Sequence, residues 1–106
     1  PLWLEWAFVP PELRQTLETL AEPVTQRKHA RAEILRGCIL KLCQERFLGL
    51  RVLAHLLQRD PDDLRKPTLK PLVAEGALRT AYPSLRDPRQ AYTVGTGNSA
   101  DKGQSG

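Results

Sequence analysis

Two short helical patterns separated by a tight turn occupy the middle of the chain, between residues 50 and 76. The apolar residues of each pattern fall on one face of a helix: Leu50, Leu53, Leu56 and Leu57 in the first, and Leu64, Leu69, Leu72 and Val73 in the second. Arg59, Asp60 and Pro61 form the turn, with Asp60 suited to the N-cap and Pro61 to the first turn of the second helix. The stretch predicts a helix-turn-helix, whose second helix leaves one face free for a partner, commonly the DNA major groove.

Two further helices are predicted before this stretch. Pro10 and Pro11 open the first, which spans about residues 11–21 with leucines at helical spacing. The second spans about residues 30–45, and its apolar stripe makes it the expected spine of the core. A short strand over residues 46–49 is predicted between this helix and the central pair.

Prolines shape the second helix of the central pair. Pro67 and Pro71 each remove a hydrogen-bond donor, so we expect this helix either to bend or to have a loose first turn and a firmer segment over about residues 67–74. Gly76 supplies its C-terminal stop. Strand-like alternation over residues 77–82, a turn-rich loop and a second apolar segment over residues 91–94 then predict a hairpin.

These elements predict a mostly α fold with a small β-hairpin, arranged as a winged helix-turn-helix: a three-helix core plus a wing, with an additional N-terminal helix. We expect an N-terminal apolar segment and bracing helix (1–26), a winged-helix domain (27–94) and a disordered tail (95–106), which has no apolar residue except Ala100. The N-terminal segment holds Trp3, Trp6 and Phe8. Its two tryptophans should pack on this domain or on a preceding one.

Length and composition are those of a soluble globular domain. The 106 residues, 41% of them apolar, suffice for a single core. No apolar run approaches the roughly 20 residues that cross a bilayer, and the N-terminus lacks signal-peptide features, so we expect a cytoplasmic location and no membrane partner. Because the chain does not begin with methionine, we expect a fragment of a longer protein.

No catalytic or metal-binding pattern occurs in the sequence. Cys38 and Cys43 lie in a predicted helix that points them in different directions, so we expect two reduced, buried thiols. Neither a CxxC spacing nor a pair of nearby histidines is present, which argues against a metal site. Ser/His/Asp, Cys/His, paired-carboxylate and glycine-rich phosphate-loop motifs are also absent. We therefore expect no enzyme activity and no cofactor in this chain.

The formal net charge of +4 is unevenly distributed. Residues 1–26 carry a net charge of −3, and residues 27–94 carry +7. Positive charge also keeps many proteins soluble, but its concentration in the predicted winged-helix region favours a polyanionic partner, double-stranded DNA. The candidate contacts are the basic residues around the second helix (Arg59, Arg65, Lys66, Lys70), on the hairpin (Arg79, Arg86, Arg89) and before the core helix (Arg27, Lys28, Arg31). Three acidic residues, Asp60, Asp62 and Asp63, would repel phosphate at the start of the second helix of the central pair.

A set of core, turn and hairpin positions carries a family resemblance: Leu42-Cys43, Leu53-Ala54, Leu57, Arg59, Leu64-Arg65, Pro71-Leu72-Val73, Gly76, Leu78, Tyr82-Pro83, Pro88 and Gln90-Ala91-Tyr92. Over roughly residues 30–94 the chain resembles the C-terminal winged helix of bacterial RecG-related ATP-dependent DNA helicases. That group overlaps with transcriptional regulators that carry an N-terminal AlbA-like, Schlafen-type domain. The resemblance implies a DNA-binding module at the C-terminal end of a larger helicase-related or regulatory protein.

The chain departs from this family at two places on the predicted contact surface. Family members have an aromatic residue at the position of Thr68, and an Asn-His pair at the position of Arg86-Asp87. The helicase motor has no counterpart here, because a GxxxxGK[ST] loop is absent.

Two functions remain open from the sequence. The first is DNA binding through the second helix and the wing. The alternative is a docking module that binds the parent protein's other domains or a twin copy without contacting DNA. The N-terminal aromatic residues and the aspartates and prolines of the second helix favour this alternative. The sequence specifies no oligomeric state.

Overall fold

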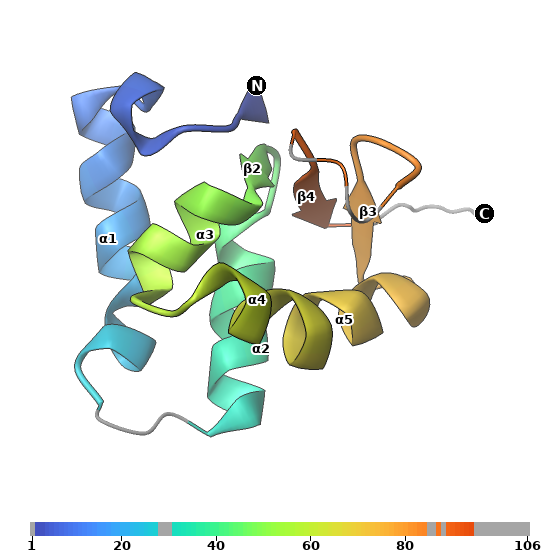
Figure 1. The fold of residues 1–106 in the computed structure, drawn as a ribbon. Coiled ribbons are helices and arrows are strands. Elements are labelled where there is room, and N and C mark those ends of the chain that lie inside the picture. Colours follow the sequence, from blue (N-terminus) through green and yellow to red (C-terminus); the bar gives the residue numbers. More distant parts are fainter. Residues whose placement is uncertain (1, 28–30, 85–86, 88, 95–106) are drawn as a thin grey trace, which may run out of the picture.

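The computed structural model describes residues 2–27, 31–84, 87 and 89–94. Most of this part of the chain is helical, and a small mixed sheet lies beside the helices (Figure 1). The sheet has the strand order β1-β2-β4-β3. Lys28, Arg86 and the predicted tail lie outside the described residues. Within the described part, no helix has both the length and the apolar character to cross a membrane.

The N-terminal segment forms an edge of the sheet. β1 (Leu2–Trp3) pairs in parallel with β2 (Phe47–Gly49), and the 3-10 turn η1 (Trp6–Phe8) follows it. The Trp6 ring lies against that of His55, with their centroids 4.6 Å apart. The expected packing of the two tryptophans on this domain is confirmed, since Trp3 and Trp6 both lie against the core, whereas Phe8 is exposed. Its pairing with the sheet was not predicted, because two residues are too few to show a strand periodicity.

Gly49 allows β1 to approach β2 closely. An added Cβ at this position would lie 3.0 Å from the Cα of Leu4 and 3.2 Å from the carbonyl oxygen of Trp3, both backbone atoms. We expect Gly49→Ala to displace β1 and to lower the free energy of unfolding by about 1–3 kcal/mol, the usual cost of an overpacked site. Urea unfolding measures the loss, and amide exchange in β2 locates it.

Gly37 provides the matched control. It lies inside α2 (Ala32–Leu42), and a Cβ there would meet no atom within 4 Å. Gly37→Ala should therefore raise the free energy of unfolding by about 0.5–1 kcal/mol, because glycine loses more backbone freedom than alanine when a helix forms. Equal destabilisation by the two substitutions would contradict the close approach at Gly49.

The N-terminal helix is longer than predicted. α1 (Pro11–Thr25) continues past residue 21 and contains Pro23. Ala21 and Val24, on either side of this proline, are both buried against the core. Burial of this face offsets the hydrogen bond that the proline removes, so tertiary packing decides where the helix ends.

The core helix α2 is shorter than the predicted range of 30–45. It ends at Leu42, and the carbonyl of the next residue, Cys43, accepts hydrogen bonds from the sheet. The Val94 backbone N–H donates to this carbonyl at 3.1 Å, and the Thr93 hydroxyl donates at 3.0 Å. The chain then turns at Glu45, which has a φ of 61°, and enters β2 close to the predicted strand.

The central pair of helices is present. α3 (Leu50–Leu57) is the first, and the left-handed Gln58, with a φ of 56°, ends it. The second helix, which we call the composite helix, covers residues 61–74 and has three parts: α4 (Pro61–Leu64), the π-helical η2 (Arg65–Leu69) and α5 (Lys70–Ala74). The predicted N-cap is confirmed, since the Asp60 carboxylate accepts a hydrogen bond from the Asp62 N–H at 3.1 Å.

A change of hydrogen-bond pattern accommodates the prolines of the composite helix. In η2 each bond reaches one residue further than in an α-helix, so the Lys70 N–H donates to the Arg65 carbonyl. Pro67 lies inside this π segment, and Pro71 lies in the first turn of α5. The irregular part is therefore the middle of the helix. Of the two alternatives expected, a bend or a loose first turn, the loose first turn is wrong, because the first turn is capped and regular. Gly76, with a φ of 85°, follows as the predicted stop.

The hairpin consists of β3 (Leu78–Thr80) and β4 (Ala91–Val94), which pair antiparallel. β4 has the predicted bounds and also pairs with β2. β3 is shorter than the predicted range of 77–82. Just beyond its end, the Tyr82 N–H donates to the side chain of Gln90 at 2.9 Å.

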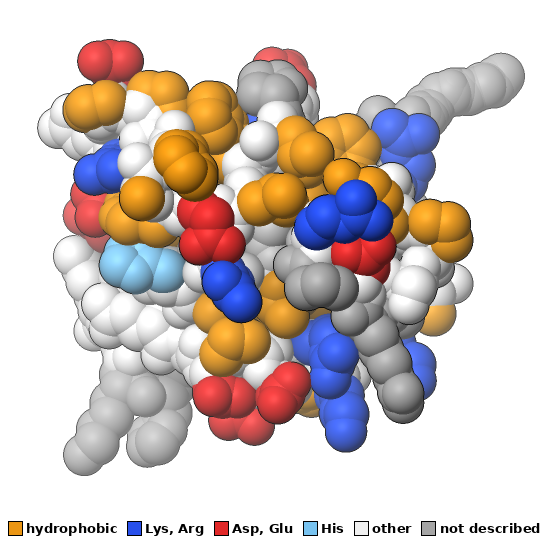
Figure 2. Space-filling model, turned by 45° about the horizontal axis from the view of Figure 1, so that its top comes forward, with side chains coloured by type: hydrophobic (Ala, Val, Ile, Leu, Met, Phe, Trp, Pro, Cys, Tyr) orange, Lys and Arg blue, Asp and Glu red, His pale blue; other side chains and the backbone are white. Residues whose placement is uncertain are grey.

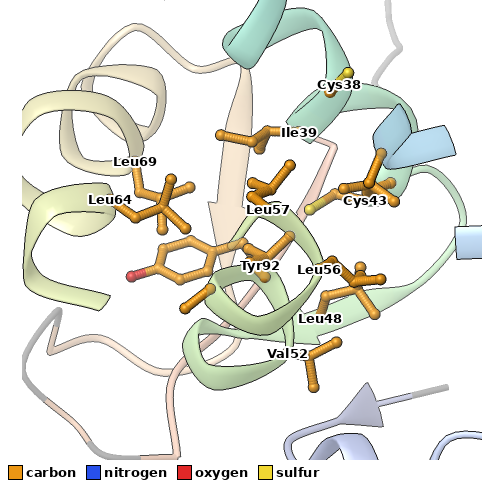
Figure 3. Packing of buried hydrophobic residues seen from close by; sticks show 14 of the residues in the cluster. Cys38, Ile39, Cys43, Leu48, Val52, Leu56, Leu57, Leu64, Leu69 and Tyr92 are labelled. Atoms are coloured by element: carbon orange, nitrogen blue, oxygen red, sulfur yellow. The ribbon is translucent and has the colours of Figure 1, made fainter. Parts of the chain in front are cut away.

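One cluster of buried apolar side chains joins the helices to the sheet. Tyr92 of β4 is the largest side chain that is fully buried. In Figure 3 its ring extends towards Leu64 and Leu69 of the composite helix. The position of the composite helix therefore depends on the hairpin as well as on the helices.

The two cysteines are buried and free, as predicted. Burial raises the pKa of the Cys43 thiol from 9.0 to about 12, and it also raises the pKa of Cys38. Because the folded-state pKa of Cys43 is raised, its contribution to stability is complete below pH 9 and is lost as the pH rises towards 12. Between pH 9 and pH 12 we expect the free energy of unfolding to fall by up to about 1.4 kcal/mol per pH unit.

Urea unfolding from pH 8 to 11 tests this dependence, with Cys43→Ala as the comparison. The variant should be less stable at pH 8, and its stability should fall less steeply with pH. A variant with the same slope as the original chain would show that another group carries the alkaline sensitivity.

Candidate nucleic-acid interface

The outer face of the composite helix is basic. Lys66 and Lys70 are exposed and lie four residues apart, and neither forms a salt bridge among the described residues. The opposite face is buried through the side chains of Leu64, Thr68, Leu69 and Leu72. Two ammonium groups are thus held on one side of a helix whose other side is fixed in the core.

Acidic residues surround the start of the same helix. Asp60 is used as the N-cap, whereas Asp62 and Asp63 are exposed. Arg65 is mostly covered, and its guanidinium lies 3.3 Å from the Asp62 carboxylate. Figure 2 shows basic and acidic side chains next to one another along the lower edge of the molecule. An approaching polyanion would therefore be repelled at the first turn and attracted further along.

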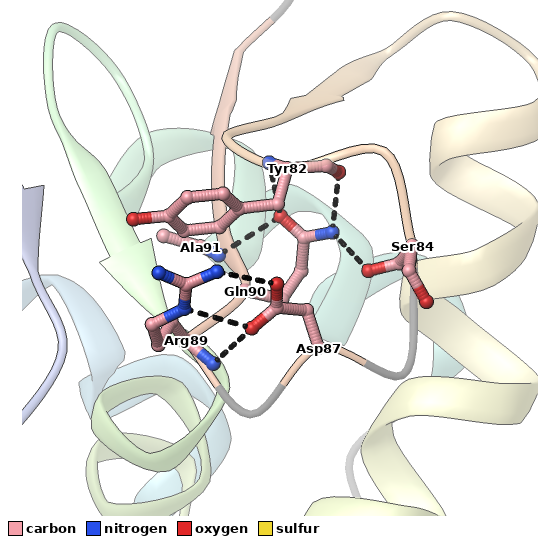
Figure 4. Close-up of polar contacts among 6 residues, drawn as sticks. All are labelled: Tyr82, Ser84, Asp87, Arg89, Gln90 and Ala91. Atoms are coloured by element: carbon pink, nitrogen blue, oxygen red, sulfur yellow. Dashed lines mark hydrogen bonds and ion pairs between the residues drawn. The ribbon is translucent and has the colours of Figure 1, made fainter.

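Arg89 belongs to an ordered group at the base of the wing, the loop between β3 and β4. Its Nε and Nη2 donate to the Asp87 carboxylate at 3.2 and 3.1 Å, and its backbone N–H donates to the same carboxylate at 2.8 Å. The guanidinium also lies over the Tyr82 ring, 4.5 Å from its centroid (Figure 4). The hydrogen bonds from Arg89 lower the pKa of Asp87 below its ordinary value. Nη1 of Arg89 has no hydrogen bond within the part of the chain that the structure describes.

Arg79 is exposed on β3, in register with Thr93. Side chains alternate across a strand, so Arg79 lies on the opposite face of the hairpin from Thr80 and Tyr92. Arg79 is therefore directed away from the core side of the sheet.

Arg59 and Arg27 lie together, although they were predicted at separate places. Both line a mostly polar hollow of about 390 Å³ between the ends of α1 and α3. Arg31, at the N-cap of α2, is exposed and lies 3.8 Å from the Glu33 carboxylate. Arg27 and Arg59 thus form a second basic region, between the ends of α1 and α3.

One of the two positions at which the chain differs from the family it resembles is buried. Thr68 is only 9% exposed and faces the core, so the position does not touch the contact surface as expected from the sequence. A side chain of different size there would change how the composite helix packs. The other described departure, Asp87, does lie at the wing, where it contacts Arg89.

Gln90 is a site residue that the sequence did not single out for function. It is 2% exposed, and its amide group connects both ends of the wing. Two signals pointed to this position: its place directly before a predicted strand and its place among the positions that carry the family resemblance. In the described part of the chain, no three His, Cys, Asp or Glu side chains are grouped so that they could hold a metal ion.

Comparison of the chain with protein-family models, with curated proteins and with solved structures finds no match.

Proposed function

We propose that this chain is a winged helix-turn-helix module that binds double-stranded DNA. The order α2, β2, α3, composite helix, β3, β4, with β4 paired to β2, supports the winged-helix assignment. The observation that carries the functional proposal is that Lys66 and Lys70 are exposed on the outer face of the second helix, with no acidic partner among the described residues.

In this proposal the composite helix enters the major groove through its middle and C-terminal half. Asp62 and Asp63 keep its first turn away from the phosphates, and Lys66 and Lys70 contact the backbone or the base edges. Arg89 at the base of the wing contacts a phosphate or the adjacent minor groove. Arg79, Arg27, Arg59 and Arg31 add to the positive field that steers DNA towards the molecule.

We further propose that the module belongs to a larger cytoplasmic protein, in line with its resemblance to the C-terminal domain of RecG-related helicases and Schlafen-type regulators. Its role there is to bind DNA, and any ATP-dependent chemistry lies in the parent protein's other domains.

Titration of the ¹⁵N-labelled chain with a random-sequence duplex tests DNA binding directly. We expect amide shifts at residues 59–70 and 84–90, and an affinity that falls steeply with salt, because phosphate contacts release counterions. Shifts that are absent from both regions at low salt would overturn the proposal.

A second candidate function is docking through the N-terminal segment. Phe8 is 74% exposed and Leu2 is 43% exposed, and both line a hollow beside Arg51. Light scattering after size exclusion would detect self-association that increases with concentration. Under this candidate, Phe8→Ser should abolish the association, whereas a chain that stays monomeric at all concentrations would exclude docking onto a twin copy.

A further inference from the structure

The side chain of Gln90 closes the base of the wing. Its Oε1 accepts hydrogen bonds from the backbone N–H groups of Tyr82, at 2.9 Å, and of Ala91, at 3.2 Å. Its Nε2 donates to the carbonyl oxygens of Tyr82, at 2.6 Å, and of Ser84, at 2.7 Å. One buried side chain thus satisfies backbone groups at both ends of the loop (Figure 4).

These bonds replace strand pairing where the hairpin opens. The last backbone bond of the ladder joins the Ala81 N–H to the Ala91 carbonyl at 2.9 Å, and beyond it the strands separate. A buried amide that loses its hydrogen-bond partners is unfavourable, so these bonds favour the observed loop geometry over geometries that break them. The two ends of the wing are therefore held at a set separation before any ligand arrives.

Gln90 is linked to Arg89 through contacts that both residues make with Tyr82. Gln90 holds the backbone of Tyr82 on both its N–H and its C=O, and the Tyr82 ring supports the Arg89 guanidinium. Asp87 fixes the same guanidinium from its edge, and the Asp87 carbonyl accepts the Gln90 backbone N–H at 2.9 Å. Displacement of Tyr82 would thus move the surface on which Arg89 rests.

We propose that Gln90 is a positioning residue for the wing: it orients Arg89 towards DNA through Tyr82 without touching DNA itself. This inference rests on the proposed DNA-binding function. Preorganisation of this kind strengthens binding because the loop loses little additional freedom in the complex.

Gln90→Met tests the inference, since methionine has a similar length but forms none of the four hydrogen bonds. We expect faster exchange of the Tyr82 amide in the free protein, duplex affinity about 10-fold weaker and a log–log salt slope smaller by about one. Gln15→Met, at an exposed position on α1, is the control and should leave all three unchanged.

A double-mutant cycle separates positioning from general destabilisation. If Gln90 acts through Arg89, Gln90→Met should weaken binding less than about twofold in an Arg89→Ala background, while its effect in a Lys66→Ala background should remain about 10-fold. Circular dichroism establishes that each variant is folded. Gln90→Asn, which keeps an amide but is too short to reach both ends of the loop, replaces Gln90→Met if the latter does not fold.

The outcomes distinguish the two proposals. If the original chain binds duplex DNA and folded Gln90→Met binds equally well, or if its loss multiplies fully with that of Arg89→Ala, the positioning role is overturned alone. If the original chain shows no salt-dependent binding, the proposed function is overturned and this inference with it.

Discussion

Replacing both Lys66 and Lys70 by alanine is expected to weaken binding to duplex DNA by about 100-fold at low salt. Each ammonium group is exposed on the outer face of the composite helix without an acidic partner among the described residues, so each can give a charge-assisted hydrogen bond to a phosphate or a base edge. If both lysines contact phosphates, the slope of log affinity against log salt should fall by about two. Fluorescence anisotropy with a labelled duplex at several salt concentrations measures both quantities.

Lys41→Ala is the control for the loss of positive charge. Lys41 is exposed near the end of α2, outside the composite helix and the wing. Its removal lowers the net charge but removes no proposed contact, so affinity should change less than about threefold. If Lys41→Ala and the single variants of Lys66 and Lys70 weaken binding equally, the net charge of the chain carries the binding, and the composite helix has no special role.

Tyr92→Ala is expected to produce the largest loss of stability, about 3–5 kcal/mol. The ring is fully buried and lies against Leu64 and Leu69, so its truncation leaves a cavity between the hairpin and the composite helix. For a domain of this size the melting temperature should fall by more than about 12 °C. Differential scanning calorimetry measures the change, and near-ultraviolet circular dichroism reports the loss of packing.

Tyr92→Phe separates the ring from its hydroxyl group. The Tyr92 hydroxyl is buried and has no hydrogen-bond partner among the described residues, and burial raises the pKa of this phenol. Since an unpaired buried hydroxyl is unfavourable, Tyr92→Phe should be at least as stable as the original chain. A loss comparable with that of Tyr92→Ala would show that the hydroxyl group, and not the ring, holds the two elements together.

Several elements were predictable because their signals are local. The N-cap at Asp60, the helix stop at Gly76 and the bounds of β4 depend on residues within a few positions of each other. The prolines of the second helix indicated an irregularity, but not that a π segment would accommodate it. α1 ran longer than predicted because buried neighbours outweigh the local cost of Pro23.

The candidate interface was predictable as a set of charges but not as an arrangement. Lys66 and Lys70 were among the predicted contacts, and the structure leaves both exposed on one face. Arg65 and Arg89 were predicted in the same way, yet each has a carboxylate within 3.3 Å or less. A charged residue's sequence neighbours do not specify which of them its side chain will reach, so the availability of each cation is a tertiary property.

By itself, the sequence determined the helical segments, the central turn and the hairpin, because backbone propensity, capping and apolar spacing act over one or two helical turns. Only the tertiary structure decided that β1 completes the sheet beside Gly49, that Arg27 and Arg59 share one hollow, and that Gln90 closes the wing. These features join groups through hydrogen bonds and close packing that no local rule specifies. They form only when the core has brought separate segments together.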